Sequence, residues 1–412
     1  MTISSMLNNQ RLSVSDNPPY DPLQAFVREN HIALNGSEEG PLKGLTFAAK
    51  DVFKILGSTV GNGHPDWLRT HEADDFTAST ISRLLEAGAD LVGKTVCDEL
   101  CFSISGENWN YGSPFNPHDI SRYTGGSSAG SGASVGGGLV DFSLGSDCLG
   151  SVRVPASYCG VFGVRPTYNR VPSDGEAQYC PSMDVFGYMC STPEVFRRVS
   201  GVMLGDDQNK TPFRKLIIAR DCFDAVNPQV YQDLMPAIDH IAGQLDGVEE
   251  VIISPEGLDN WIKVFQHVQG YEVWKSYGGW INKYRPRLSR GPKERLQWAS
   301  TITMKQYEDG LKRKQEISDH VNGLLSDGAV MVMPTAASVA PSRTAALEDI
   351  NATRLQSTYL LCVSPLSGVP QMTLPMVFVD KLPLGISLLS AAHTDLALAN
   401  FSATVTESYK QN

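Results

Sequence analysis

The sequence lacks the marks of several classes of protein. No apolar run approaches the roughly 18 residues of a membrane-spanning helix, and the opening MTISSMLNNQRLS has neither the basic nor the apolar region of a signal peptide. The eight cysteines include no CxxC pair, and the eight histidines include no HExxH motif. We therefore expect a soluble, cytoplasmic protein with reduced thiols, no membrane contact, no metal ion and no cofactor.

Basic residues are also scarce. The 34 Lys and Arg residues against 45 Asp and Glu residues give a formal net charge of −11 at pH 7, which argues against a nucleic-acid-binding surface. Hydrophobic residues make up 42% and charged residues 19% of the chain, as in folded globular domains. The composition predicts a large buried core and a small-molecule partner rather than a nucleic acid.

Strand and helix patterns alternate along most of the chain. Residues 1–40 are polar and read as an N-terminal arm with a short helix around Leu23, Phe26 and Val27. Residues 225–325 are richer in charge and tryptophan and predict a mainly helical block. Further strands and a helix are expected on both sides of that block, with strands in 44–55, 89–96, 328–334, 373–379 and 383–390 and a helix in 77–88. This order of strand and helix patterns predicts one continuous sheet in a single α/β domain over 41–412.

A phosphate-binding motif is the first candidate site. The segment GADLVGKT at 88–95 matches GxxxxGK[ST], with Lys94 and Thr95 in the key positions. A working loop of this type follows a strand and opens a helix, so that its amides face the phosphates. Here a helix precedes the segment, and the apolar Leu91 and Val92 lie inside it. This context favours a helix end followed by a strand whose Lys94 points to solvent.

A nucleophile elbow is the second candidate. The segment GSSAG at 126–130 satisfies GxSxG with Ser128 as the nucleophile. That chemistry needs an acidic residue and a histidine downstream, an oxyanion loop of the HGGG kind and an apolar strand leading into the elbow. Downstream histidines exist, for example His240 and His393, but no HGGG occurs and SRYTGG precedes the serine. This interpretation is kept as a minor alternative.

The third candidate combines two serines with a lysine. Residues 121–167 are dense in glycine and serine, and Ser127 and Ser151 each follow a glycine, 24 positions apart. Upstream, Lys50 ends an apolar strand. Without a suitable histidine, a lysine can activate a serine if burial holds it neutral. Ser127 would then relay a proton between Ser151 and Lys50. The backbone amides of the nucleophile turn would form an oxyanion hole, namely those of Cys148, Leu149, Gly150 and Ser151.

These residues carry a resemblance to a known family. The segment GGSSAGSGASVGGGLVDFSLGSDCLGSVRVPASYCGVFGVRPT resembles the signature of the amidase signature family of serine hydrolases. GLTFAAKDVF, LLEAGADLVGKTVCDEL and DGAVMVMPTAASVAP resemble further blocks of that family, as do SPLSGVPQMTLPM and LPLGISLL. The resemblance covers roughly 41–395, and such an ordered set of blocks is far more specific than one motif. It implies a central mixed sheet covered by helices on both faces.

The resemblance also implies a Ser, cis-Ser, Lys triad. Ser151 would be the nucleophile, Ser127 the bridging serine after a cis peptide bond, and Lys50 the base. Ser151 would attack an amide carbonyl, and the proton would pass through Ser127 and Lys50 to the leaving ammonia or amine. The 88–95 motif then becomes an accident of the family's helix-strand junction, and Ser128 a neighbour of the nucleophile.

Within the family, HPDWLRTH, ISGENWNYGSP and SVRVPASYCGVFGVRP most resemble plant-type indole-3-acetamide hydrolases, which release ammonia from arylacetamides. A small aromatic or apolar carboxamide is therefore the expected substrate. Trp67, Trp109 and Tyr123, with Ser128, are candidates to line its pocket, although core or surface packing explains the three aromatic residues equally well. A homodimer is common among relatives, but nothing in the sequence itself requires one.

One departure from the family concerns the nucleophile turn. The family usually has Thr-Gly-Gly-Ser where this chain has Cys148-Leu149-Gly150-Ser151. A leucine in place of glycine would narrow the acyl pocket or shift the oxyanion amides, and Cys148 beside the site is either a reactive or a buried thiol. Two alternatives to a stand-alone amidase therefore stay open: the amidase subunit of a glutamine-dependent amidotransferase, and a non-catalytic binding protein with this fold.

Overall fold

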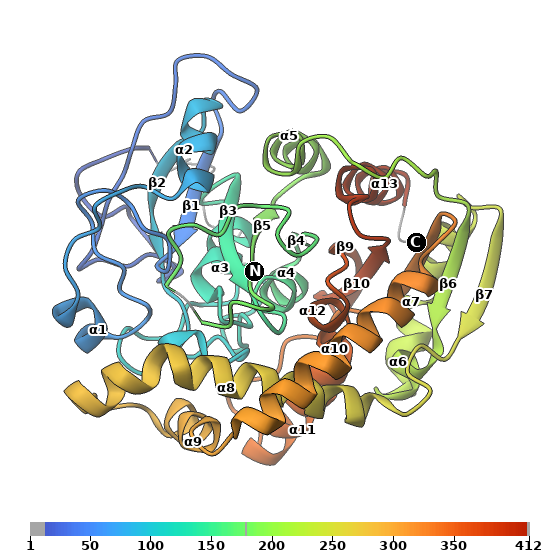
Figure 1. Ribbon diagram of the computed structural model, residues 1–412. Coiled ribbons are helices and arrows are strands. Elements are labelled where there is room, and N and C mark those ends of the chain that lie inside the picture. The colour runs from blue at the N-terminus through green and yellow to red at the C-terminus, as the bar shows by residue number, and fades with distance from the viewer. Residues whose placement is uncertain (1–12, 178, 410–412) are drawn as a thin grey trace.

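Ten strands form one mixed sheet in the computed structural model, which describes residues 13–177 and 179–409 (Figure 1). The strand order across the sheet is β2-β1-β3-β5-β4-β9-β10-β8-β6-β7. The strands are β1 (Thr46–Lys50), β2 (Asp90–Thr95), β3 (Phe142–Asp147), β4 (Phe162–Arg165), β5 (Val185–Cys190), β6 (Lys215–Ala219), β7 (Gly247–Val251), β8 (Ala329–Pro334), β9 (Gln371–Val379) and β10 (Leu382–Ser390).

Parallel pairs lie at both ends of the sheet and antiparallel pairs in its middle. β1 runs parallel to β2 and β3, and β6 runs parallel to β7 and β8. The neighbours from β3 through β5, β4, β9 and β10 to β8 are all antiparallel. The carboxyl ends of β1 and β3 therefore meet at one edge, which is where α/β sheets commonly place their sites.

Helices cover both faces of the sheet, as the alternation of side chains along the strands requires. In β1, Phe47 and Ala49 join the large apolar cluster that includes side chains of α2, α5 and α13, whereas Ala48 joins a separate cluster with α3 and α4. The helices are α1 (Pro65–Thr70), α2 (Ser79–Glu86), α3 (Ala129–Gly136), α4 (Arg153–Cys159), α5 (Pro193–Leu204), α6 (Arg220–Asp224), α7 (Pro228–Ala242), α8 (Leu258–Tyr284), α9 (Arg290–Ala299), α10 (Met304–Leu324), α11 (Leu347–Leu361), α12 (Val363–Ser367) and α13 (Asp395–Ser408).

The predicted α/β architecture with a central mixed sheet is confirmed. Residues 225–325 form the helices α7 to α10 and the strand β7, and in Figure 1 the long helices α8 and α10 run below the sheet together with α9 and α11. Across the described residues, no helix has the length and apolar character needed to cross a membrane.

Two local predictions were wrong. The described part of the N-terminal arm, 13–40, contains no helix; Phe26 and Leu34 instead form isolated antiparallel bridges with Thr95 and Leu91. The arm thus packs along β2, and the apolar residues around Phe26 serve that packing. Lys94 also does not point to solvent. Its side chain is fully buried, with Nζ 2.8 Å from Asp51 Oδ1 and 2.8 Å from the Thr59 carbonyl.

The density of small residues in 121–167 has a packing reason. α3 begins directly after the Gly-Ser-Ser segment and lies against the arm and β2. A Cβ at Gly130 would come 2.2 Å from the Ala25 carbonyl oxygen and 2.8 Å from the Val96 nitrogen. Glycine is therefore required for α3 to lie close enough to position the residues before it.

Candidate active site

Lys50 and Ser127 lie at the centre of the candidate site. Lys50 is the last residue of β1, and Ser127 lies in the loop that leads into α3. The fully buried Lys50 Nζ donates to Ser127 Oγ at 2.8 Å and to Ser146 Oγ, on neighbouring β3, at 3.0 Å. The Gly126–Ser127 peptide bond is cis.

Ser151 lies in the turn between β3 and α4. It borders a small cavity of about 10 Å³ together with Ser127 and Ser146, so the structure brings Ser151 and Ser127 to the same space. Ser151 is 6% exposed and also lines a larger cavity. Lys50, Ser127 and Ser151 thus gather at the carboxyl ends of β1 and β3. Ser128 Oγ is fully buried, makes one long contact of 3.5 Å to the Ser146 carbonyl, and lines neither cavity.

The turn that carries the predicted nucleophile Ser151, residues 148–151, is built around Asp147. This buried carboxylate accepts hydrogen bonds from the amides of Gly150 at 2.9 Å and Val152 at 3.0 Å. Arg153 Nη2 lies 2.8 Å and Arg165 Nη1 3.3 Å from Asp147 Oδ1. Burial disfavours the charged form, but the two guanidinium groups outweigh it and hold the pKa of Asp147 below its usual range. The turn is therefore held by a buried ionic cluster.

The backbone amides of this turn differ in whether they already have a hydrogen-bond acceptor. The Gly150 amide is used by Asp147, whereas the amides of Leu149 and Ser151 have no hydrogen-bond acceptor among the described residues. Gly150 has φ +94°, and a Cβ there would come 2.7 Å from Leu361 Cδ1, so this position requires glycine. Leu149 has no left-handed backbone and its side chain lines the larger cavity. Its effect is therefore to narrow the cavity.

Two cysteines lie beside Lys50. Cys101 borders both cavities and donates to Asn62 Oδ1 at 3.5 Å, and the side chains of Cys97, Lys50 and Ser127 all influence the pKa of its thiol. The hydrogen bond from Cys97 is the main reason that the pKa of Cys101 is lowered to about 6, and Lys50 lowers it further. Burial works to lower the pKa of Lys50, but the negative charge of the nearby sulfur atoms and Glu176 raises it overall. Lys50 is thus paired with Cys101 and is not held neutral by burial alone.

Cys148 behaves differently. It is 5% exposed, and burial raises the pKa of its thiol to about 12. A thiol of this kind is a poor nucleophile at neutral pH. Of the two readings that the sequence left open for Cys148, the geometry favours the buried thiol.

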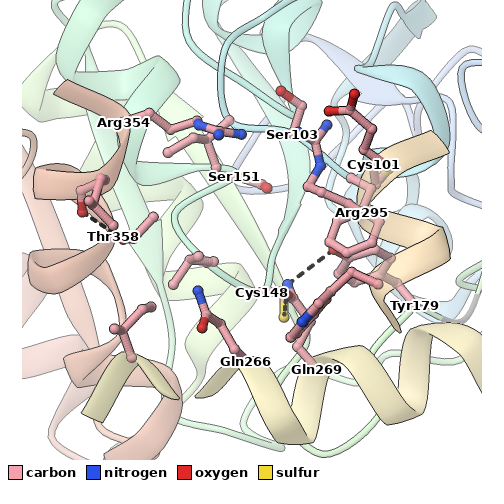
Figure 2. A pocket seen from close by; sticks show the side chains of 17 residues that line it. Cys101, Ser103, Cys148, Ser151, Tyr179, Gln266, Gln269, Arg295, Arg354 and Thr358 are labelled. Atoms are coloured by element: carbon pink, nitrogen blue, oxygen red, sulfur yellow. Dashed lines mark hydrogen bonds between the residues drawn. The ribbon is translucent and has the colours of Figure 1, made fainter. Parts of the chain in front are cut away.

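The larger cavity has a volume of about 430 Å³ and opens from Ser151 toward the helical block (Figure 2). One wall comes from the nucleophile turn and the segment after β2, and the opposite walls come from α8, α9 and α11. Apolar and aromatic side chains dominate the lining: Phe102, Ile104, Leu149, Tyr179, Ile262, Trp298 and Leu355. Its polar side chains include Gln266, Gln269, Arg295, Arg354 and Thr358.

The aromatic residues singled out from the sequence do not line this cavity. Trp67 packs against Tyr277 and Trp280, with ring centroids 5.3 and 5.0 Å away. Trp109 is 62% exposed and faces the Arg287 guanidinium. Tyr123 borders a separate small cavity. The three therefore have packing or surface roles.

The cavity walls supplied by the helical block were not predicted from the sequence. Ile262, Gln266 and Gln269 follow one another at helical spacing on α8, as do Arg354 and Thr358 on α11. That spacing could have identified one face of each helix, but not that the two faces meet at the same serine.

Comparison with known proteins places these features in a family. A sequence model described as Amidase matches residues 23–235. "Amidase 1" of Arabidopsis thaliana is 33% identical over 404 residues, which cover 90% of this chain and 95% of that protein. "Translocon at the outer membrane of chloroplasts 64" of Pisum sativum is 32% identical over 85% of this chain, and the match spans 63% of that longer protein.

Solved structures give the same result for the fold. A structure described as "Crystal structure of amidase" superimposes with a TM-score of 0.79 at 25% identity, covering 90% of this chain and 86% of that one. The mixed sheet and the helices on both its faces are thus shared with an experimentally determined relative.

Proposed function

Because the chain belongs to the amidase family, and is therefore an amidase, we propose that it hydrolyses the C–N bond of a small carboxamide through an acyl-enzyme on Ser151. The observation that carries this proposal is the 2.8 Å contact between Lys50 Nζ and Ser127 Oγ, next to a cavity that Ser151 also borders. Hydrolysis yields the carboxylic acid and ammonia.

The proposed mechanism assigns one step to each residue. Ser151 Oγ attacks the amide carbonyl while its proton moves to Ser127, whose own proton moves to Lys50. The free amides of Leu149 and Ser151, with that of Cys148, stabilise the developing oxyanion. The same relay run in reverse gives the proton to the leaving ammonia, and water then releases the acid. The Gly150 amide takes no part, because Asp147 uses it.

The lining of the cavity supports a substrate with an apolar or aromatic body. Phe102, Tyr179 and Trp298 offer ring surfaces within the 430 Å³ space, which suits a small arylacetamide. The similarity to plant proteins named "Amidase 1" supports amide hydrolysis. A cytoplasmic location is also proposed, supported by the eight buried cysteines, all of which are free.

Covalent labelling of Ser151 tests the mechanism. A fluorophosphonate probe is expected to leave a single adduct on Ser151, located by peptide mass mapping, and the adduct should be lost in Lys50→Ala because the serine is no longer activated. Ammonia release from phenylacetamide should be blocked in proportion to labelling. An adduct on Ser128 would instead support the nucleophile elbow, and an unlabelled but folded protein would contradict the proposal.

The pH profile tests the pairing of Lys50 with Cys101. The Cys101 thiolate raises the pKa of Lys50, so the free base forms only at higher pH. In Cys101→Ala the pKa of Lys50 should fall, and the acidic limb of the kcat/KM profile should move to lower pH. Cys190→Ala removes a buried thiol from β5, away from Lys50, and should leave that limb in place. An unmoved limb in Cys101→Ala would contradict the pairing.

A further inference from the structure

Two arginine side chains reach the larger cavity without a counter-ion. Arg295 comes from α9 and Arg354 from α11, and both are half-buried. Over residues 13–177 and 179–409, neither guanidinium makes an ion pair or a hydrogen bond, and Arg295 Nε is buried without a partner. Arg295 does lie over the Phe102 ring, 5.4 Å from its centroid, but this contact supplies no counter-ion.

The two charges act on one another. Burial, and then the neighbouring Arg354, lowers the pKa of Arg295 to about 10, and burial also lowers that of Arg354. In Figure 2 the nitrogen atoms of both side chains lie toward the Ser151 and Ser103 end of the cavity. Two neighbouring arginine side chains without an ion pair are unexpected in a chain whose net charge is −11. An anion placed between the two groups would remove their repulsion and satisfy their donors.

Glu294 is the one carboxylate on the described cavity lining, whereas Asp98 and Glu107, whose charges also act on Arg295, lie outside that lining. Glu294 lies on the cavity lining, but its Oε1 is 2.8 Å from Arg290 Nε on the outer side of α9. The remaining polar side chains of the lining are neutral amides, hydroxyls and thiols apart from Cys101, which is paired with Lys50. The described lining therefore offers two free cations and no free carboxylate.

We propose that Arg295 and Arg354 form a carboxylate-binding subsite, and that the preferred substrate is an amide whose apolar body carries a carboxylate. This inference rests on the proposed amidase function, since it describes the same cavity. A guanidinium binds a carboxylate through two parallel hydrogen bonds, and the surrounding apolar walls strengthen that contact by excluding water. Because no free carboxylate is available for an ammonium group, amino acid amides such as glutamine are poor substrates.

Three probes separate the sources of the carboxylate. Phenylacetamide is neutral, 4-carboxyphenylacetamide carries a carboxylate on its ring, and phenylacetylglycine carries the carboxylate on the leaving amine. All three keep the same phenylacetyl amide as the reacting group. The measured quantity is kcat/KM for each probe, together with L-glutamine. The wild type is expected to prefer one of the anionic probes to phenylacetamide by about 10-fold or more, as charge-assisted hydrogen bonds require.

Variants of the two arginines test whether these side chains cause the preference for the anionic probe. Arg354→Met and Arg295→Met should each reduce the preference for the anionic probe, measured as the ratio of its kcat/KM to that of phenylacetamide, by about 10- to 100-fold. Lys293→Met is the matched control, because Lys293 is an exposed cation on the same helix, α9, that does not line the cavity. Its preference should equal that of the wild type.

A binding measurement distinguishes failure of the subsite from failure of the amidase function. The product 4-carboxyphenylacetate should raise the Tm of the wild type and of Lys293→Met but not of Arg354→Met, whether or not any amide is hydrolysed. Hydrolysis of phenylacetamide without preference for either anionic probe would overturn the subsite and leave the amidase function intact. Stabilisation that depends on Arg354 but comes without turnover would support the subsite and refute the amidase function.

Discussion

Lys50→Ala is expected to lower kcat for amide hydrolysis by about 10² to 10⁴-fold, the range typical of a lost general base. Ser151→Ala should cost more, on the order of 10⁶-fold, because no acyl-enzyme can form. The two losses differ because, in the proposed mechanism, Ser151 forms the covalent bond, whereas Lys50 acts only through Ser127, to which its Nζ donates at 2.8 Å. Ammonia release under saturating substrate measures both losses.

The double variant Lys50→Ala/Ser151→Ala provides a sharper test of whether the two residues act together. If Lys50 and Ser151 act as one unit, Lys50→Ala adds nothing once Ser151 is already alanine, so the double variant should match Ser151→Ala. Ser128→Ala is the matched control, because this serine is the immediate neighbour of Ser127 but borders neither cavity. Its rate should stay close to that of the wild type. Multiplicative losses in the double variant, or an inactive Ser128→Ala, would contradict the assignment.

The fold was largely predictable because its signals are local. Strand and helix periodicity identified β1, β2, α2 and β8 to β10, and the family resemblance supplied the mixed sheet. The N-terminal helix was predicted wrongly because Leu23, Phe26 and Val27 suit a helix by spacing alone. In the structure, Phe26 bridges to Thr95, a contact that no local pattern reveals. The burial of Lys94 could not be predicted from local pattern either, because its partner Asp51 follows a different strand.

Lys50, Ser127 and Ser151 could be proposed as a triad from the sequence because each lies in a segment that resembles a family motif. The cavity could not be predicted in the same way, since its walls come from six separate segments of the chain. Arg295 and Arg354 look like ordinary helix-surface cations in the sequence, and only the packing of α9 and α11 shows that they share a space. Cys101 likewise stands in no recognisable motif. In the structure, Leu100 and Cys101 have left-handed backbone conformations, and the Cys101 thiol interacts with Lys50.

Asp147→Asn is expected to destabilise the protein by about 3 to 5 kcal/mol, because it leaves two buried guanidinium groups without a counter-charge. Arg153 and Arg165 are 0% and 1% exposed, so water cannot replace the carboxylate. Chemical denaturation at neutral pH measures the loss. Asp309→Asn is the matched control: it breaks an exposed ion pair with Lys305 and should cost less than about 1 kcal/mol.

The pH dependence of the stability lost in Asp147→Asn identifies the cause of that loss. The pKa of Asp147 is depressed in the folded protein, so its charge contributes stability above the pKa of an unfolded aspartate, and this contribution disappears as the pH falls through the folded value. The difference between wild type and Asp147→Asn should therefore be full at neutral pH and shrink only in strong acid. The variant should also lower kcat, since an asparagine amide offers one acceptor oxygen where the carboxylate serves the Gly150 and Val152 amides with two. A variant as stable as the wild type would show that the cluster does not hold the nucleophile turn.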